Sequence, residues 1–397
     1  MATPLRVLLL NNYLPPRGGA EAHVQGVLGL LRKAGHAAEL HAPEDASGWP
    51  AVRDRVHNPV ILRLVSSRIR EFAPDLIHVH NFLRRLSVAP FLAARQAGVP
   101  TLLTVHDFQL FCPRTWAVRA GGEPCAAPSL PLCALGNCRG GLDGIRGRAV
   151  YAMNTLRLRW AAREVSRNAT RIVAPSRALA RRLALTLGRE VAHLPHPFPT
   201  APPFAPPPNR DLLFLGRASR EKGLRELLVG LASSPRGTEP LRLTVAGDGP
   251  DLEGLRDLAR ARGLDGTVRF EGRVEAARVP DLLRGHGALV VPSVWMENSP
   301  LVVHEALAAG RPVLGSNRGG IPELVTDGVE GFLFDPLDPT SMVGVLDRWA
   351  SCGDRAQEMA MNAQKRATAG GGPAEWLPRL LEEYRAAIEG ARAGSRR

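Results

Sequence analysis

Two carboxylates in an otherwise apolar stretch are the residues of this chain best suited to binding a polar ligand. Glu297 and Glu305 are separated by seven residues within the segment 290–313. One carboxylate can accept hydrogen bonds from two vicinal hydroxyl groups, and burying it without such a partner is costly. The pair is therefore typical of a site for a polyol. The alternative from spacing alone is that Glu305 pairs with an arginine of a neighbouring helix.

Cations lie at a predicted strand end nearby in the sequence. The motif Gly216-Arg217-x4-Lys222-Gly223 directly follows the predicted strand Asp211–Leu215. Arginine offers a planar fork of donors and lysine a point charge, a combination that suits a diphosphate without a metal. Two further glycine motifs, Gly247-x-Gly249-Pro250 and Gly319-Gly320-x-Pro-Glu323, also follow predicted strands. Each glycine motif alone is more often an ordinary turn than a ligand site.

The first half of the chain has its own candidates at strand ends. Gly18 and Gly19 lie between the first predicted strand and its helix, where a ligand can approach the backbone at a helix N-terminus. His106 ends the predicted strand Thr101–His106, and His78 and His80 alternate on the strand before it. A single histidine is more often structural, but several at strand ends favour a functional role for His106.

Several common nucleotide and hydrolase motifs are missing. The sequence has no G-x-x-x-x-G-K phosphate loop, no G-x-S-x-G elbow, no H-E-x-x-H and no pair of aspartates spaced i, i+2. A bound nucleotide must therefore be held without these devices.

The arrangement of predicted elements indicates an α/β protein with two doubly wound domains. Short apolar runs alternate with helical-period stretches along almost the whole chain, as in βαβ units. A Pro-rich stretch interrupts this alternation once. We expect a cleft between the carboxyl ends of the two parallel sheets. The predicted parts are an N-terminal domain at 1–198, a linker at 199–208, a C-terminal domain at 209–372, and a C-terminal helix at 373–397 that packs back on the N-terminal domain.

Charge and composition bound the class of protein. The 397 residues are 45% hydrophobic, which excludes a disordered chain, and no apolar run is long enough to cross a membrane. Residues 1–198 hold 26 Lys and Arg against 12 Asp and Glu, so the positive excess lies in the first half. That excess favours an anionic partner there. The run Leu5–Leu10, which contains Arg6, predicts a strand and not an export signal, which favours a cytoplasmic location.

Taken in order, these motifs resemble the retaining glycosyltransferases of family 4. The resemblance spans about residues 5–335 and is most specific at Glu297-x7-Glu305 with its Pro-Leu-Val and Ala-Gly neighbours. It implies the GT-B fold, two Rossmann-like domains facing a central cleft. It also implies transfer of a sugar from a nucleotide-diphosphate sugar, with UDP favoured and GDP the alternative, and with the anomeric configuration kept.

The resemblance implies roles for individual residues. Arg217 and Lys222 would hold the diphosphate, and Glu305 the ribose hydroxyls. Glu297 would orient the donor sugar, and His106 would meet that sugar near the reacting centre. The remaining donor-site residues implied in this way are Gly18, Gly19, Gly247, Asn298, Ser299, Pro300 and Leu301. One departure is that Ser299-Pro300 stands where many members have Gly-Phe or Gly-Leu, which removes a backbone N–H donor.

The expected mechanism needs no divalent cation or other cofactor. The charge that builds on the leaving diphosphate would be stabilised by Arg217, Lys222 and helix N-termini. In front-side attack, the donor phosphate itself removes the acceptor proton. Ser299 is the expected N-cap of the helix that carries Glu305, with Pro300 at its first position.

Four cysteines cluster after His106. Cys112, Cys125, Cys133 and Cys138 fall on a Gly/Pro-rich segment, where a structural zinc clip is one interpretation. The irregular gaps and the lack of a C-x2-C pair favour free thiols or a labile disulfide instead.

The resemblance implies transfer to a glycan, a lipid-linked acceptor or a small molecule. An amphipathic helix is predicted over about 145–168, with an apolar stripe along Ile145, Ala149, Met153, Leu156 and Trp160 and a basic line along Arg159, Arg163 and Arg167. It fits either an ordinary packed helix or a helix that rests on an anionic membrane surface. A peripheral location at the inner face of the membrane is therefore one expectation.

Two other functions compete. A nucleotide-sugar epimerase shares the fold, but the Glu297-x7-Glu305 motif argues against it. The basic first half also allows a nucleic-acid-binding protein, which 5% aromatic content and the lack of a recognition motif disfavour.

Overall fold

The structure is a computed structural model that describes residues 3–14, 18–43, 58–119, 123–125, 133, 144–234 and 241–394. The chain divides into two compact units, which we call the N-terminal and C-terminal units. The N-terminal unit consists of Met1–His196 and Ala374–Arg397, and the C-terminal unit of Pro197–Pro373. The stretch 199–208 is thus counted with the C-terminal unit.

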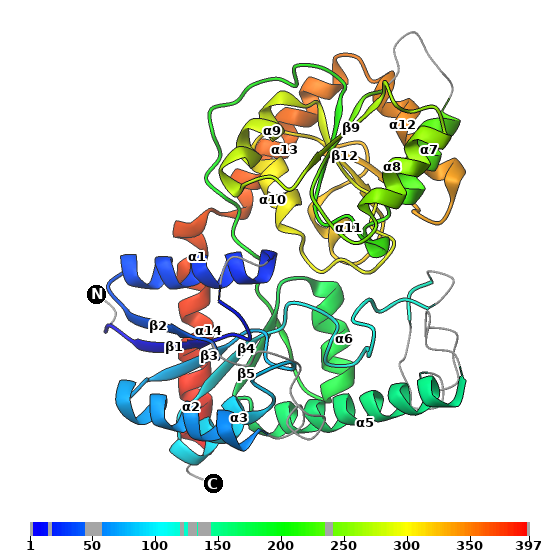
Figure 1. Cartoon of the computed structure of the whole chain (residues 1–397). Coiled ribbons are helices and arrows are strands. Elements are labelled where there is room, and N and C mark those ends of the chain that lie inside the picture. The colour runs from blue at the N-terminus through cyan, green and yellow to red at the C-terminus, as the bar shows by residue number, and fades with distance from the viewer. Residues whose placement is uncertain are drawn as a thin grey trace. The chain divides into compact units, whose positions relative to one another are not determined.

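A six-stranded parallel sheet forms the centre of the N-terminal unit, with strand order β2-β1-β3-β4-β5-β6 (Figure 1). Its strands are β1 Arg6–Leu10, β2 Ala37–His41, β3 Leu76–Val79, β4 Thr101–Thr104, β5 Arg171–Ala174 and β6 Ala192–His193. Its helices are α1 Gly19–Lys33, α2 Pro59–Phe72, α3 Ala89–Ala97, α5 Gly144–Asn168, α6 Arg177–Leu187 and α14 Pro373–Gly394. Parallel strands need crossover connections, and the helices between them supply these.

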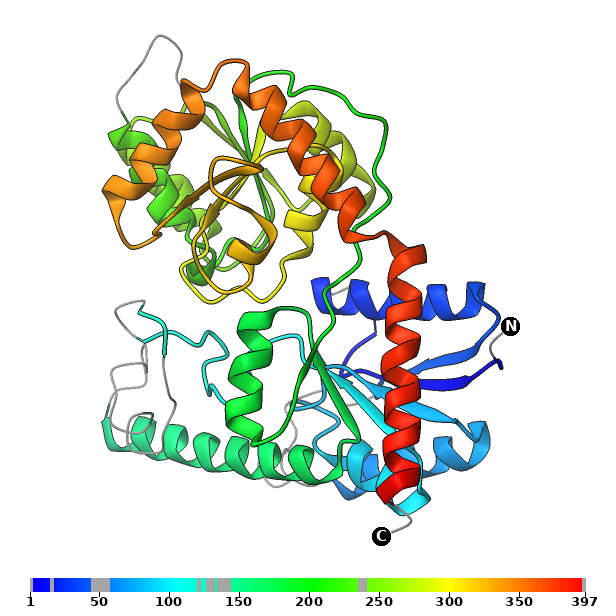
Figure 2. The ribbon, with the colours of Figure 1, turned by 180° about the vertical axis from the view of Figure 1, so that it is seen from behind.

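The last helix, α14, completes this unit's core. Trp376, Leu380 and Tyr384 are spaced by four residues, so they lie on one face of the helix, and they pack against strand residues such as Val7 and Leu9. The Trp376 indole N–H also donates to the Pro195 carbonyl over 2.6 Å. Figure 2 shows the length of α14 running across this sheet. The end of the chain therefore folds with its beginning.

A second parallel sheet forms the C-terminal unit, in the order β12-β11-β10-β7-β8-β9. Its strands are β7 Leu212–Leu215, β8 Leu243–Ala246, β9 Val268–Gly272, β10 Ala288–Val291, β11 Val313–Ser316 and β12 Gly331–Phe334. Its α-helices are α7 Leu224–Ser233, α8 Leu252–Ala261, α9 Val279–Gly285, α10 Leu301–Ala308, α11 Ile321–Leu324, α12 Pro339–Ala350 and α13 Arg355–Gly370, with short 3₁₀ turns at Arg220–Lys222 and Ala276–Arg278.

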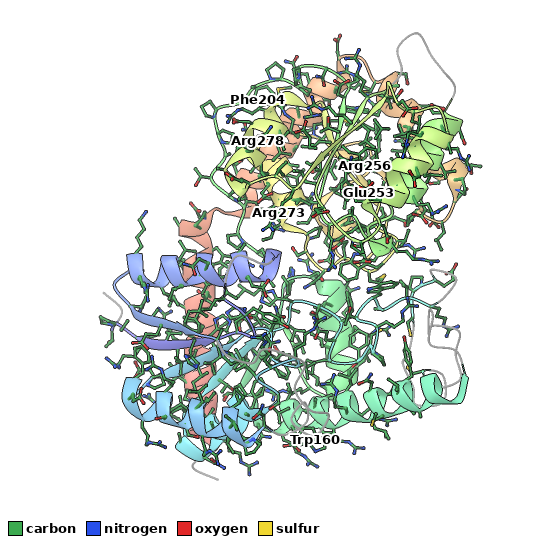
Figure 3. The ribbon with its side chains drawn as sticks, in the orientation of Figure 1. Trp160, Phe204, Glu253, Arg256, Arg273 and Arg278 are labelled. Carbon is green, nitrogen blue, oxygen red and sulfur yellow. The ribbon has the colours of Figure 1, made fainter. Side chains whose placement is uncertain are left out.

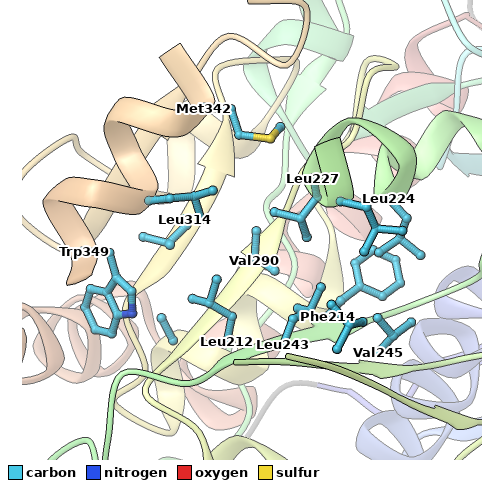
Figure 4. Close-up of a cluster of buried hydrophobic side chains, with 14 of the residues drawn as sticks. Leu212, Phe214, Leu224, Leu227, Leu243, Val245, Val290, Leu314, Met342 and Trp349 are labelled. Atoms are coloured by element: carbon cyan, nitrogen blue, oxygen red, sulfur yellow. The ribbon is translucent and has the colours of Figure 1, made fainter. Parts of the chain in front are cut away.

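Strand alternation divides this unit's core between two helix layers. Leu212 and Phe214 face the layer that contains Leu227 of α7 and Trp349 of α12 (Figure 4). Leu213 and Leu215 point the other way and pack against α9, α10 and α13. With helices on both faces, the inner strands β7, β8, β10 and β11 are buried along their whole length, as parallel sheets require, whereas only the first residue of the edge strand β9 is buried. The prediction of two doubly wound parallel sheets is confirmed.

Candidate functional site

The strand order of the C-terminal unit brings the predicted site loops together. β7 is hydrogen-bonded to β10, and β10 to β11. Parallel neighbours end at the same edge of the sheet, so the loops that follow these three strands lie side by side. Lys222 lies on the first of these loops and Glu297 on the second, and Gly319 follows the third strand.

Lys222 and Glu297 form an ion pair across two of these loops. Lys222 Nζ lies 2.7 Å from Glu297 Oε1, and Ser293 Oγ donates to the same oxygen over 2.6 Å. The ammonium also lies 4.9 Å from the centre of the Trp295 ring. Only 6% of the Glu297 side chain is exposed, against 25% for Lys222. The pair thus presents its cation to solvent and keeps its carboxylate inside.

The charge of Glu297 is stabilised in this setting. Burial by itself raises the pKa of a carboxyl, but the Lys222 ammonium and the hydrogen bonds from Lys222 and Ser293 outweigh it, so the Glu297 pKa lies below its usual value. Glu297 is therefore a fixed anion at neutral pH, suited to accept hydrogen bonds from hydroxyl groups and not to give up a proton.

Close backbone contacts hold the two loops around this pair. Gly319 adopts φ +61°, and a Cβ there would lie 1.9 Å from the Glu297 carbonyl oxygen. The neighbouring Gly320 N–H donates to that same oxygen over 2.8 Å. At Gly223, with φ +71°, a Cβ would lie 1.8 Å from the Pro292 carbonyl oxygen. Only glycine permits these approaches, so the glycine motifs here position the Glu297 loop.

The start of α10 differs in detail from the prediction. The helix begins at Leu301 with Pro300 as its N-cap residue, and no side chain caps it. The expectation that Ser299 is the N-cap is wrong, because its hydroxyl instead lies 2.8 Å from His304 Nε2. The N-cap residue thus offers no side-chain acceptor to the first turn, and the Val303 N–H donates to the Pro300 carbonyl over 3.0 Å. The N–H groups before Val303 are the ones at this helix start that suit a ligand anion.

Glu305 lies half-buried on α10, and no charged side chain among the described residues pairs with it. Burial raises its pKa to about 7, and no neighbouring charge in the described part of the chain offsets that rise. The alternative of an arginine partner thus finds no support among the residues that the structure describes. When ionised, this carboxylate can accept hydrogen bonds with both oxygens, so it binds ligand hydroxyl groups more strongly than the protonated carboxyl does.

The other predicted residues of this unit lie around the same sheet edge. Arg217 follows β7 and is exposed, and Gly247 follows the adjacent β8, where its N–H donates to the Gly272 carbonyl over 2.7 Å. Asn298 is buried beside Glu297 in the sequence, and Leu301 is the first residue of α10. In the part of the chain that the structure describes, no hydrogen bond or ion pair joins Arg217 or Glu305 to the Lys222–Glu297 pair, so contacts link two of the four charged residues predicted here.

In the N-terminal unit, His106 belongs to a buried group of histidines. β3 and β4 are neighbours, so His80 and His106 follow adjacent strands, with His80 Nδ1 and His106 Nε2 2.9 Å apart. The ring of His23 lies 4.1 Å from that of His196 and 5.4 Å from that of His106, between centroids. Sequence reasoning missed His23 and His196, because one lies on α1 and the other just beyond β6. Burial lowers the pKa of His106 to about 4, so the ring is neutral at physiological pH.

The glycines of the first predicted motif begin α1. Gly18 is the N-cap residue and Gly19 the first residue of the helix, and both are exposed. Glu21, in the first turn, is buried. The helix start thus exposes its backbone at the end of β1, as expected for an anion or polyol site.

The cysteine cluster is only partly described. Cys138 lies outside the described residues, while Cys112 and Cys125 are free thiols. Among described residues, no group of three His, Cys, Asp or Glu side chains could hold a metal ion. A search of the same residues finds no helix that meets the length and apolar content of a transmembrane span.

Comparison with known families follows the same division of the chain. Residues 201–366 match the family Glycosyl transferases group 1, and residues 18–195 match the Glycosyl transferase 4-like domain. Glycogen synthase of Mycobacterium tuberculosis is 27% identical over 387 residues, which cover 92% of this chain and 90% of that protein. D-inositol 3-phosphate glycosyltransferase 2 of Catenulispora acidiphila is 36% identical over 198 residues, 46% of each chain.

Solved structures share the architecture. The complex of Anabaena Alr3699/HepE with UDP-glucose superposes with a TM-score of 0.69 at 19% identity, covering 95% of this chain and 98% of that one. Sucrose-phosphate synthase from Thermosynechococcus elongatus gives 0.73 at 17% identity, with 96% and 98% covered. The family matches fall on both units and these structures cover almost the whole chain, so this protein belongs to the glycosyl transferase group 1 / glycosyl transferase 4-like family of nucleotide-sugar glycosyltransferases with the GT-B fold.

Proposed function

We propose that this glycosyltransferase moves a hexose from a UDP-sugar to its acceptor with retention of configuration and without a metal ion. The observation that carries the proposal is the Lys222–Glu297 ion pair at the edge of the C-terminal sheet, beside the uncapped start of α10. It provides one cation, one fixed anion and free backbone donors within neighbouring loops. These are the groups that a sugar linked to a diphosphate requires.

The diphosphate would lie against Lys222, Arg217 and the first-turn N–H groups of α10. Lys222 is bonded to Glu297 on one side and exposed on the other, so it can accept a phosphate as a second partner. Two cations and a helix N-terminus balance the charge of a leaving diphosphate, the task that a magnesium ion performs in other enzymes. This supports a metal-independent reaction.

The carboxylates of Glu297 and Glu305 would accept hydrogen bonds from hydroxyl groups of the donor. Glu305 is half-buried and has no partner charge among the described residues; it would accept from the ribose diol, and Glu297 would accept from the donor sugar. In the reaction, the bond from the anomeric carbon to the diphosphate oxygen breaks while a bond to the acceptor oxygen forms on the same face. The acceptor proton passes to an oxygen of the leaving phosphate, so no protein nucleophile is needed.

A UDP-sugar is favoured over a GDP-sugar by one comparison. Alr3699/HepE, which superposes over almost the whole chain, was solved with UDP-glucose and with UDP. We propose that the N-terminal unit binds the acceptor and that His106, Gly18 and Gly19 are the ligand-binding residues of this unit.

A membrane-bound, lipid-linked acceptor is supported by the surface of α5. Met153 and Leu156 are exposed by 47% and 54%, and Trp160 lies on the outer side of the helix (Figure 3). The predicted apolar stripe is therefore not the packed face of α5. Its buried residues are instead Tyr151, Thr155, Leu158, Ala161, Ala162 and Val165.

Basic residues run beside this exposed stripe. Arg159, Arg163 and Arg167 follow one another at four-residue spacing and line a cavity of about 520 Å³ between α5 and α6. Arg182 of α6 lines it as well, and no carboxylate does. Exposed apolar side chains next to arginines suit an anionic lipid surface, and we propose a peripheral cytoplasmic location at the inner membrane face.

The decisive experiment measures nucleoside diphosphate released from a panel of UDP- and GDP-sugars, with and without EDTA. We expect one UDP-sugar to release UDP, at a rate that EDTA does not change. The anomeric configuration of the transferred sugar, read from its anomeric proton, should be the same as in the donor. Lys222→Met should abolish turnover, while Lys365→Met, which removes an equal charge from an exposed position on α13, should not. Loss of turnover in EDTA with recovery on adding a divalent ion would refute the metal-free mechanism.

A further inference from the structure

The buried His80 and the half-buried His106 form an imidazole pair that is joined by one hydrogen bond. His80 is 1% exposed, and its Nδ1 lies 2.9 Å from His106 Nε2. Both rings are neutral at physiological pH, because burial lowers the pKa of each. Two neutral rings share a single proton on this contact, so one ring donates and the other accepts.

The surroundings of His80 Nε2, the ring nitrogen that does not contact His106, indicate which ring donates. Its Nε2 is buried and has no hydrogen-bond partner among the described residues. If His106 donated, His80 would carry its own proton on Nε2, and a buried N–H would be left without an acceptor. If His80 donates from Nδ1, only a lone pair is left unpaired there. Buried N–H groups without partners are rarer in proteins than acceptors with unused lone pairs, so the second arrangement is favoured.

The neighbouring His78 shows what a fully bonded histidine looks like in the same strand. Its Nδ1 lies 2.8 Å from the Tyr384 hydroxyl and its Nε2 2.8 Å from the Thr104 hydroxyl. His78 is completely buried and links β3 to β4 and α14. These two hydrogen bonds show that His78 has a structural role. His80 is buried to the same degree. Among the described residues, the side-chain hydrogen bond of His80 goes to His106, the residue expected at the reacting sugar.

We propose that His80 is a positioning residue that fixes His106 in the tautomer protonated on Nδ1 and holds its ring in place. His106 Nε2 then accepts from His80 and is not available as a base. The ring is then a neutral hydrogen-bond donor at Nδ1 and not a base at Nε2. The part of this inference that concerns catalysis rests on the proposed function, whereas the tautomer itself does not.

The test separates these two parts by using nuclear magnetic resonance of the full-length protein labelled with ¹⁵N-histidine. The resonances of His80 and His106 are assigned from the spectra of His80 and His106 variants. In the wild type we expect His106 to show a protonated Nδ1 and an unprotonated Nε2. A proton on Nε2 of His106 would overturn the proposal outright.

Two variants of matched size then test the direction of the bond. An asparagine amide N–H reaches about the position of imidazole Nδ1, and a glutamine amide that of Nε2. His80→Asn should therefore keep the His106 tautomer, and His80→Gln should lose it. His78→Gln, which breaks other bonds in the same strand, should lower thermal stability and leave the His106 tautomer unchanged. Retention of the wild-type tautomer in His80→Gln would contradict the proposal.

Kinetics with UDP-glucose as the probe complete the test. Release of UDP by His80→Asn should remain within about twofold of wild type, and His80→Gln should lower kcat about tenfold with little change in KM, the effect of one misdirected hydrogen bond. Equal kcat in both variants, with the tautomer changed, would overturn the positioning role. If the wild type shows the expected tautomer but never releases UDP, the donor assignment fails and the tautomer stands.

Discussion

The Lys222 ammonium lies 2.7 Å from the Glu297 carboxylate although 75 positions separate them in the chain. The contact exists because β7 and β10 are neighbours in the sheet, so that their following loops meet. Each residue is therefore the charge partner of the other before a ligand binds. In the proposed function, a donor phosphate that approaches Lys222 would meet a cation already fixed in place, which is preorganisation of the kind that electrostatic catalysis needs.

Removing Lys222 alone should destabilise the fold as well as abolish donor use. Lys222→Met leaves a buried carboxylate without its cation, which should lower the free energy of unfolding by about 1–3 kcal/mol. The double variant Lys222→Met/Glu297→Gln should regain part of that loss, because no unpaired charge remains. Urea unfolding of the wild type, the single variants and the double variant measures the coupling. Additive effects would show that the pair contributes nothing.

The same pair predicts a pH effect on stability. The folded pKa of Glu297 lies below its ordinary value of 4.5, so the folded state binds fewer protons than the unfolded state in that range. The resulting stabilisation is present above pH 4.5 and is lost as the pH falls through the lower folded pKa. The Glu297→Gln variant should lack this contribution. Parallel acid-unfolding curves for the two proteins would contradict the assignment.

Glu305 should behave in the opposite way. Its pKa is raised to about 7, so between pH 4.5 and 7 the folded state binds more protons than the unfolded state, and stability falls as the pH rises through that window. Glu305→Gln should therefore be more stable than wild type by about 2–3 kcal/mol at pH 8 and equal to it near pH 4.5. Thermal unfolding at both values tests this. A residue that weakens the fold in order to bind a ligand is typical of an active site.

The affinity for the donor should depend on pH with the same pKa of Glu305. In the proposed site, ribose hydroxyls donate to an ionised Glu305, so the Kd of UDP-glucose should rise about tenfold from pH 8 to pH 6. UDP-glucose is the probe because it lacks the free terminal phosphate that titrates near pH 6 in UDP. Calorimetry at pH 7 in buffers of different ionisation enthalpy should show proton release on binding. In Glu305→Gln both effects should vanish, and their persistence would place the titrating group elsewhere.

Gly319 and Gly328 form a matched pair for testing the packing of the Glu297 loop. Both have positive φ, at +61° and +78°, but a Cβ would collide with the Glu297 carbonyl at Gly319 and meet nothing within 4 Å at Gly328. Gly328→Ala should cost only the backbone strain, about 1 kcal/mol. Gly319→Ala should cost about 1–3 kcal/mol more and reduce turnover, because the loop must move. Equal losses in urea unfolding would show that this contact is unimportant.

The sequence supported a correct prediction of both sheets, because buried parallel strands appear as short apolar runs at regular intervals. Strand order did not follow from the pattern, and it decides which strand-end loops meet. Ser293 and Trp295 beside Glu297 were missed for that reason, as were His23 and His196. The error about Ser299 arose because its hydroxyl has a competing partner in His304. On α5, helical periodicity identified an apolar stripe but not which face the sheet covers.

Reversing the charge of α5 tests the proposed membrane contact. The variant Arg159→Glu/Arg163→Glu should reduce co-sedimentation with vesicles containing anionic phosphatidylglycerol at least about tenfold, since each arginine near such a surface contributes about 1 kcal/mol. Arg262→Glu/Arg273→Glu, the same change at two exposed positions of the C-terminal unit, should bind like wild type. Binding should weaken as salt rises and be lost on neutral vesicles. Equal binding by both double variants would mean that overall charge, and not the surface of α5, draws the protein to the lipid.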